Sequence, residues 1–124
     1  MPVVGLHHVQ VAAPLGAEDE ARRFYGTLVG LAEVEKPMPL AERGGVWFAC
    51  GRQTLHIGVD AAFSAAQKAH PALELDSPEE LRSLAARLVE AGVEVRWSEE
   101  LPAYERFYAE DPWGNRLELL APVR

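Results

Sequence analysis

Four side chains that can bind a divalent metal occupy matching places in the two halves of this sequence. A shift of 62 residues places His8 on His70 and His56 on Glu118. Each falls on the face of an expected strand opposite the strand's aliphatic residues, because strand side chains alternate between faces. Three imidazoles and one carboxylate form a ligand set for a borderline to hard divalent ion, with no thiolate in it. If the two halves pair so that these faces line one concavity, the four side chains converge on a metal site.

Each of these residues also has an ordinary structural explanation. A single histidine on a strand is usually hydrogen-bonded or solvent-facing, and a lone carboxylate such as Glu118 is usually solvated. The chain has only four histidines, and three of them fall in the matched positions. The shared register therefore favours the metal site. His7, the remaining histidine, shares a face with Val9 and Val11, which predicts a packed structural role.

Sequence periodicity predicts the elements that would position these residues. Alternating apolar and polar residues predict strands over residues 6–11, 31–35, 46–50, 54–59, 70–76, 93–97 and 106–110, and a last strand after a turn at 111–115. Helical spacing of Ala21, Phe24 and Leu28 predicts an amphipathic helix over 17–28. A second helix is predicted from Ser77, as its N-cap, to Gly92, as its stop.

The order of elements is the same in both halves: strand, helix, strand, strand, strand. The sequence thus predicts an α+β fold in a single domain, residues 1–124, with one βαβββ module at about 5–60 and a second at about 69–121. Residues 47–49 match residues 107–109 at a shift of 60, which places about two extra residues in the last turn of the second half. Residues 60–69 are expected to connect the modules, with a helical turn at 61–67.

Composition excludes several classes of protein. Twelve basic against nineteen acidic residues give a net charge of -7, so a broad basic surface for nucleic acid is lacking. The sequence also predicts no membrane segment. Cys50 is the single cysteine and lies in an apolar run, which indicates a buried side chain, no intrachain disulfide and a cytoplasmic location.

The closing run Asp-Pro-Trp-Gly-Asn-Arg-Leu-Glu at residues 111–118 carries a family resemblance. Further matching stretches lie at residues 6–11, 24–31 and 70–75, so the match covers essentially the whole chain. The sequence resembles the vicinal oxygen chelate superfamily, the glyoxalase, bleomycin-resistance and extradiol-dioxygenase group. The resemblance implies paired βαβββ modules that form an open β-barrel-like sheet, with helices outside, around one divalent metal ion (Zn, Ni, Mn or Fe).

Position by position, the resemblance implies metal ligands at His8, His70 and Glu118. His56 stands where similar glyoxalases usually have glutamate and epimerases have glutamine, so its role as the fourth ligand departs from the glyoxalase pattern. Extradiol dioxygenases use two histidines and one glutamate, and a fourth histidine departs from that pattern too.

The expected activity is that of a glyoxalase-like lyase or isomerase acting on a small oxygen-chelating substrate. The metal would act as a Lewis acid on substrate oxygens, and Glu118 would be the catalytic proton shuttle. Trp47, Arg106 and Tyr108 are the predicted substrate-binding residues. Two alternatives stay open: a non-catalytic small-molecule or antibiotic-binding protein of the bleomycin-resistance kind, and an extradiol-type dioxygenase. A homodimer is expected.

Overall fold

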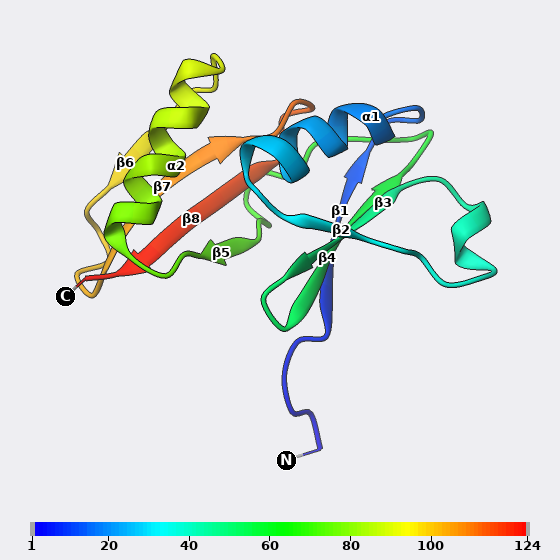
Figure 1. Cartoon of the computed structure of the whole chain (residues 1–124), viewed down its shortest axis with the longest axis horizontal. Coiled ribbons are helices and arrows are strands. Elements are labelled where there is room, and N and C mark those ends of the chain that lie inside the picture. The colour runs from blue at the N-terminus through cyan, green and yellow to red at the C-terminus, as the bar shows by residue number, and fades with distance from the viewer. Residues whose placement is uncertain (1, 124) are drawn as a thin grey trace. The chain divides into compact units, whose positions relative to one another are not determined.

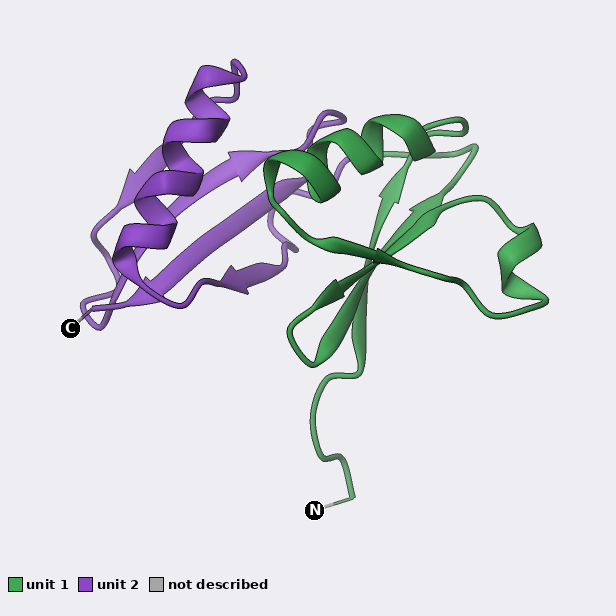
Figure 2. Ribbon diagram, in the orientation of Figure 1, with its two compact units in different colours: residues 1–64 green, residues 65–124 purple. Residues whose placement is uncertain are grey.

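The computed structural model describes residues 2–123 and divides the chain into two compact units, residues 1–64 and residues 65–124 (Figure 2). Met1 and Arg124, the two ends of the predicted domain, lie outside the described residues. The predicted α+β fold is confirmed, because each unit contains one four-stranded mixed sheet and one main helix (Figure 1).

The first unit has the predicted strand, helix and three further strands. Its elements are β1 (His8–Ala13), α1 (Glu18–Ala21), η1 (Arg22–Leu28), β2 (Ala32–Val34), η2 (Leu40–Glu42), β3 (Val46–Cys50) and β4 (Gln53–Val59). The strand order in the sheet is β1-β4-β3-β2, with β1 parallel to β4 and the other pairs antiparallel. The strand predicted over residues 6–11 begins and ends two residues later.

The predicted helix over residues 17–28 forms, but its second part is a π-helix. The backbone N–H of Val29 donates to the carbonyl of Phe24, five residues earlier, at 2.9 Å. Wider π turns rotate successive residues by less than an α-helix does, so the neighbours Phe24 and Tyr25 both reach the core. Leu28, predicted on the apolar stripe, is only half-buried. Tyr25 instead packs against Phe48 of β3, and the centroids of the two rings are 6.0 Å apart.

The second unit repeats the same plan. Its elements are β5 (Ala72–Glu74), α2 (Pro78–Glu90), β6 (Arg96–Ser98), β7 (Tyr104–Glu110) and β8 (Arg116–Pro122), and the strand order is β5-β8-β7-β6. β5 is parallel to β8, as β1 is to β4. Tyr104, predicted in a loop, is the first residue of β7. Residues 60–69 contain turns and bends rather than the predicted helical turn.

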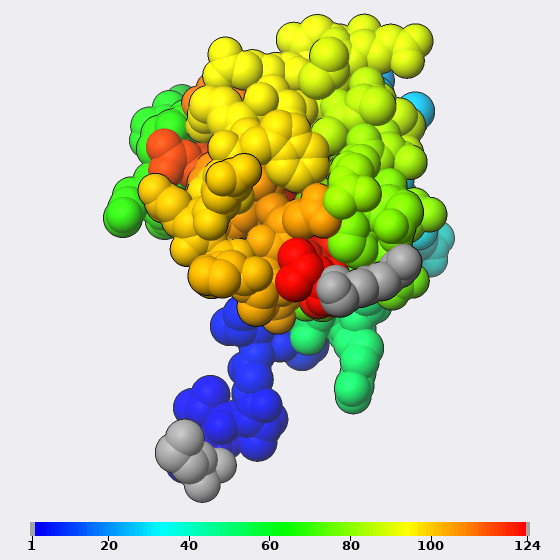
Figure 3. Space-filling view, turned by 90° about the vertical axis from the view of Figure 1, so that its left-hand side faces the viewer, coloured from blue at the N-terminus to red at the C-terminus, as the bar shows by residue number. Residues whose placement is uncertain are grey.

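The helix of the second unit begins and ends as its sequence predicts. The Ser77 hydroxyl accepts a hydrogen bond from the Glu80 backbone N–H at 3.2 Å, and Gly92 follows the helix with φ of +86°. The apolar stripe is buried, and it consists of Leu81, Leu84, Ala85 and Leu88. In Figure 3 the opposite, solvent-facing side of α2 (yellow-green) lies beside the β6 segment (yellow). The core of this unit thus lies between α2 and the sheet.

The cross-strand register is the strongest structural evidence for the internal repeat. His56 on β4 lies between Gln10 of β1 and Trp47 of β3. Glu118 on β8 lies in the same way between Ala72 of β5 and Tyr108 of β7. His56 and Glu118 therefore occupy equivalent positions in the strand pairing of the two sheets, as their sequence match predicts.

The predicted match of Trp47 with Phe107 is wrong by one residue. The register places Tyr108, not Phe107, beside Glu118 as Trp47 lies beside His56. A slip of one residue exchanges the two faces of a strand, so Phe107 points into the core, where it is fully buried. Tyr108 is then the true counterpart of Trp47.

No helix formed by residues 2–123 has the length and apolar character needed to cross a membrane.

Candidate metal centre

The second unit holds a buried carboxylate, Glu118, between two cationic or proton-bearing side chains. Glu118 is 7% exposed, so it is not the solvated acid that an isolated strand carboxylate would be. Its Oε1 lies 3.1 Å from His70 Nε2, and its Oε2 accepts a hydrogen bond from Arg106 Nη1 at 3.2 Å. The two oxygens of this carboxylate thus have different partners.

Both ring nitrogens of His70 face hydrogen-bond acceptors. Nδ1 lies 2.9 Å from the backbone carbonyl of Lys68, and a carbonyl oxygen can only accept. A neutral imidazole whose proton is on Nδ1 turns the lone pair of Nε2 toward Glu118 Oε1. That contact becomes favourable when a second proton or a cation lies between the two atoms. Metal-binding histidines commonly donate their other N–H to a carbonyl, so the His70–Glu118 pair fits a divalent ion.

Tyr108 and two arginines surround this pair. The Tyr108 ring meets His70 edge to face, with centroids 5.6 Å apart. The guanidinium carbons of Arg106 and Arg116 lie 5.4 and 5.7 Å from the centroid of Tyr108, within cation–π range. Arg116 was not among the predicted site residues, although its position two residues before Glu118 on β8 places it on the same face.

The first unit brings His8 and His56 together in a stack with Trp47. The His56 ring lies parallel to Trp47 at a centroid distance of 3.8 Å and nearly parallel to His8 at 4.3 Å. His56 is 6% exposed, and its burial, with a smaller contribution from the charge of His8, lowers its pKa. The neutral form is the one that can bind a metal.

The stacked geometry of the first unit fits a shared ion less well than the His70–Glu118 pair does. An imidazole binds a metal through a lone pair in the plane of the ring, and stacked rings have planes that run side by side. His56 Nε2 also lies 3.0 Å from Thr54 Oγ1, and His8 Nδ1 lies 3.0 Å from His7 Nδ1. His7 is exposed, so the prediction that it packs in the core is wrong.

The structure therefore brings the four predicted ligands together as two pairs, one in each unit. Within residues 2–123, no three histidine, cysteine, aspartate or glutamate side chains gather where they could hold a metal. The chemistry of the donor set nonetheless fits a divalent ion, because every imidazole and carboxylate required is present on the expected strand face. The assignment of His8, His56, His70 and Glu118 as ligands stays a prediction.

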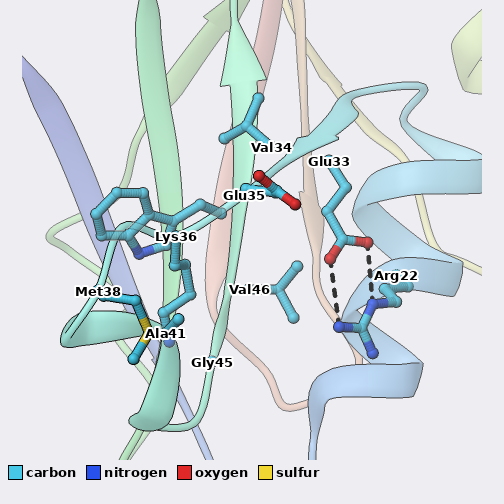
Figure 4. Close-up of a pocket in the computed structure, with 10 residues that line it drawn as sticks. Arg22, Glu33, Val34, Glu35, Lys36, Met38, Ala41, Gly45 and Val46 are labelled. Carbon is cyan, nitrogen blue, oxygen red and sulfur yellow. Dashed lines mark hydrogen bonds and ion pairs between the residues drawn. The ribbon is translucent and has the colours of Figure 1, made fainter.

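A surface pocket of about 420 Å³ in the first unit includes Trp47 in its lining (Figure 4). At one end, Arg22 donates two hydrogen bonds to Glu33, at 2.9 and 3.2 Å, and this pairing raises the pKa of Arg22. The loop between β2 and β3 forms much of the rest. Lys36 donates to the carbonyls of Arg43 and Gly44, which ties this loop to β2.

The same loop is held from the helix side. Glu18 Oε2 accepts the backbone N–H of Gly45 at 2.8 Å, and this hydrogen bond is the main cause of the lowered pKa of Glu18. Proline and glycine spacing predicts a loop at residues 37–39 and a turn at residues 43–45, which does not say where this segment lies. Two charged side chains, Glu18 from α1 and Lys36 from the start of the loop itself, hold its second half in position.

Comparison with known proteins identifies the family. The family profile described as Glyoxalase/Bleomycin resistance protein/Dioxygenase superfamily matches residues 5–119. The chain belongs to this superfamily. A solved Bacillus anthracis protein of the glyoxalase family is 44% identical, with a TM-score of 0.90 over 97% of this chain and 96% of that one. The family resemblance carried by residues 111–118 is thus confirmed.

More distant members of the superfamily share the fold. Lactoylglutathione lyase from Agrobacterium tumefaciens is 23% identical, with a TM-score of 0.76 over 98% of this chain and 96% of that chain. A fosfomycin resistance protein, FosX, from Listeria monocytogenes is 17% identical, with a TM-score of 0.76 over 98% of this chain and 95% of that chain. No curated protein sequence matches the chain. These likenesses establish the fold, and the activity rests on the site itself.

Proposed function

We propose that this chain is a metal-dependent enzyme of the glyoxalase type, a lyase or isomerase for a small substrate with neighbouring oxygens. One observation carries the proposal. His70 presents Nε2 to Glu118 Oε1 at 3.1 Å while its Nδ1 faces the carbonyl of Lys68, so the pair is arranged to share a cation. A contact of 3.1 Å between these two atoms is favourable when a proton or a cation is shared between them, as in an ion pair or at a metal site.

His70 and Glu118 would supply two ligands, and His8 and His56 are the proposed remaining ones. A divalent ion held there would supply Lewis-acid stabilisation of a substrate oxyanion. His70 would be kept in the binding tautomer by the Lys68 carbonyl. For His56 to bind, its ring must leave Thr54 and the stack with Trp47, so it is the ligand that requires the largest rearrangement.

The side chains around the pair have distinct proposed roles. Glu118 would take and return a proton through its carboxylate, which is within reach of groups on the same sheet face. Tyr108 lies beside His70, and Trp47 covers one face of His56, so both are suited to contact a substrate. Arg106 is already bonded to Glu118, which limits the donors it can offer to a substrate.

A second candidate function, binding without chemistry, is favoured by the stack in the first unit. Trp47, His56 and His8 form a column of nearly parallel rings, and such rings are typical contact surfaces for flat ligands. The FosX structure shows that resistance proteins also have this fold. This candidate requires no metal and no proton transfer by Glu118.

Activity screening with defined metals distinguishes the candidates. Chelator-treated protein would be reloaded separately with Zn²⁺, Ni²⁺, Mn²⁺ or Fe²⁺ and tested for lactoylglutathione turnover, for fosfomycin loss and for oxygen uptake with catechols. The proposal expects metal-dependent lyase or isomerase turnover that Glu118→Gln abolishes. Arg82→Gln, on α2, where the exposed arginine pairs with Glu105 and not with a predicted ligand, is the control and should keep full activity.

Two other results would redirect the assignment. Oxygen uptake under ferrous loading would identify a dioxygenase instead. Saturable ligand binding that is indifferent to metal and to Glu118→Gln would identify a binding protein.

A homodimer is also proposed, and sedimentation equilibrium of the chelator-treated and the metal-reloaded protein measures its molecular mass.

A further inference from the structure

Arg106 directs its donors toward two acidic side chains of its own unit. Nη1 donates to Glu118 Oε2 at 3.2 Å, and Nη2 lies 3.8 Å from Glu100, whose side chain is 87% exposed. Nε is buried and has no hydrogen-bond partner. The side chain of Arg106 is only 14% exposed, its hydrogen bond is to the predicted ligand carboxylate, and its guanidinium also lies over the Tyr108 ring.

The carboxylate of Glu118 is therefore divided between two cation sites. Oε1 faces His70 Nε2, the other predicted ligand of this unit, and Oε2 faces Arg106. An oxygen that already accepts from a guanidinium is a weaker donor to a metal, so the bond to Arg106 favours binding of the ion through the other oxygen of Glu118. The positive charge on Arg106 also opposes a second positive charge placed a few ångströms away.

We propose that Arg106 is a positioning residue that competes with the metal for Glu118. This inference rests on the proposed metal-dependent function. Arg106 holds Glu118 to single-oxygen binding, weakens the affinity of the site for its ion, and gives the carboxylate a cationic partner when it leaves the ion. A ligand that leaves easily is free to carry a proton, which is the role proposed for Glu118.

Two substitutions separate the charge of Arg106 from its hydrogen bond. Arg106→Gln keeps an N–H donor for Glu118 Oε2 but removes the charge. Arg106→Lys keeps the positive charge and a donor but loses the planar guanidinium group with its paired N–H donors. If charge competition governs the affinity, glutamine tightens metal binding and lysine leaves it nearly unchanged.

The test is a competition titration of Zn²⁺ between the full-length protein and a chromophoric chelator, which requires no turnover. Arg106→Gln is expected to bind Zn²⁺ about tenfold more tightly or better, since unit charges a few ångströms apart near a surface interact by more than that factor. Arg82→Gln is the matched control, because it removes the same charge from an exposed pair with Glu105. Its Zn²⁺ affinity should stay within about twofold of the wild type.

Each other outcome has a definite meaning. Unchanged Zn²⁺ affinity in Arg106→Gln, with Arg106→Lys also unchanged and both variants folded by circular dichroism, would show that Arg106 is only structural. Weaker binding in Arg106→Gln would show that Arg106 orients Glu118 for the metal and would overturn competition. If the wild type binds no Zn²⁺, Ni²⁺, Mn²⁺ or Fe²⁺, the proposed function itself fails, and the inference fails with it.

Discussion

Replacing Glu118 by alanine should cost this protein much of its stability even without a metal. The side chains of Glu118 and Arg106 are 9% and 14% exposed, so alanine leaves a largely covered Arg106 with the face of Tyr108 and a long contact to Glu100 at 3.8 Å. Breaking a buried ion pair by removing one partner costs about 3–5 kcal/mol. Whole-domain stabilities are about 5–15 kcal/mol, so the effect will be large.

Removing both charges should cost far less than removing one. Glu118→Leu combined with Arg106→Leu leaves no unpaired charge, and apolar replacements of buried pairs are often close to neutral. Glu118→Gln keeps an acceptor for Arg106 and should lose only about 1–2 kcal/mol. The single and double leucine variants form a cycle in which the interaction energy should exceed about 2 kcal/mol.

Urea unfolding followed by circular dichroism, in excess chelator, measures these free energies. The chelator keeps trace metal from stabilising the wild type selectively. If the two single leucine variants add to the double variant within about 0.5 kcal/mol, Glu118 and Arg106 are not coupled in solution. The division of the carboxylate between His70 and Arg106 would then be refuted.

Three further substitutions test the local structure. Ser77→Ala should lower stability by about 1 kcal/mol in thermal unfolding, because the N-cap bond to the Glu80 N–H is lost. Gly45→Ala should cost at least about 2 kcal/mol in urea unfolding, because Gly45 has φ of +104° and an added Cβ would lie 2.4 Å from the Ile57 carbonyl oxygen. Glu18→Gln should make the free energy of unfolding fall less steeply as the pH is lowered. The pKa of Glu18 in the folded protein is below its ordinary value of 4.5. The stability that Glu18 contributes is therefore present above pH 4.5 and is lost as the pH falls through the lower folded pKa. A Glu18→Gln pH profile parallel to that of the wild type would contradict the Gly45 contact.

The period of two along each strand predicted which side chains share a face. It placed Glu118 opposite Leu117 and Leu119, and the register of β8 confirms this. Capping chemistry likewise predicted α2, since Ser77 and Gly92 determine its ends through local hydrogen bonds and backbone angles. These are features that near neighbours in the sequence decide.

Features decided by distant residues were not predictable in the same way. The sequence matched Trp47 with Phe107 instead of Tyr108, an error of one residue. The turn before β8 sets the strand register, and the sequence alone did not determine how many extra residues that turn contains. Parity places Arg106 on the face of Glu118 but cannot reveal the hydrogen bond between the two side chains, and the predicted contact of Arg106 with a substrate stays a prediction. The stack of Trp47 on His56 depends on side-chain rotation, which no sequence period encodes.

The central claim is that this chain holds a divalent ion through the predicted ligands. Elemental analysis of the wild type and of His8→Ala, His70→Ala and Glu118→Ala, each reloaded with the same ion and passed through a desalting column, measures it. Ser77→Ala, which contacts none of the predicted ligands, serves as the control. We predict one ion per chain in the wild type and in the control, and a substoichiometric amount in the three ligand variants. Full stoichiometry in all three ligand variants would contradict the metal centre.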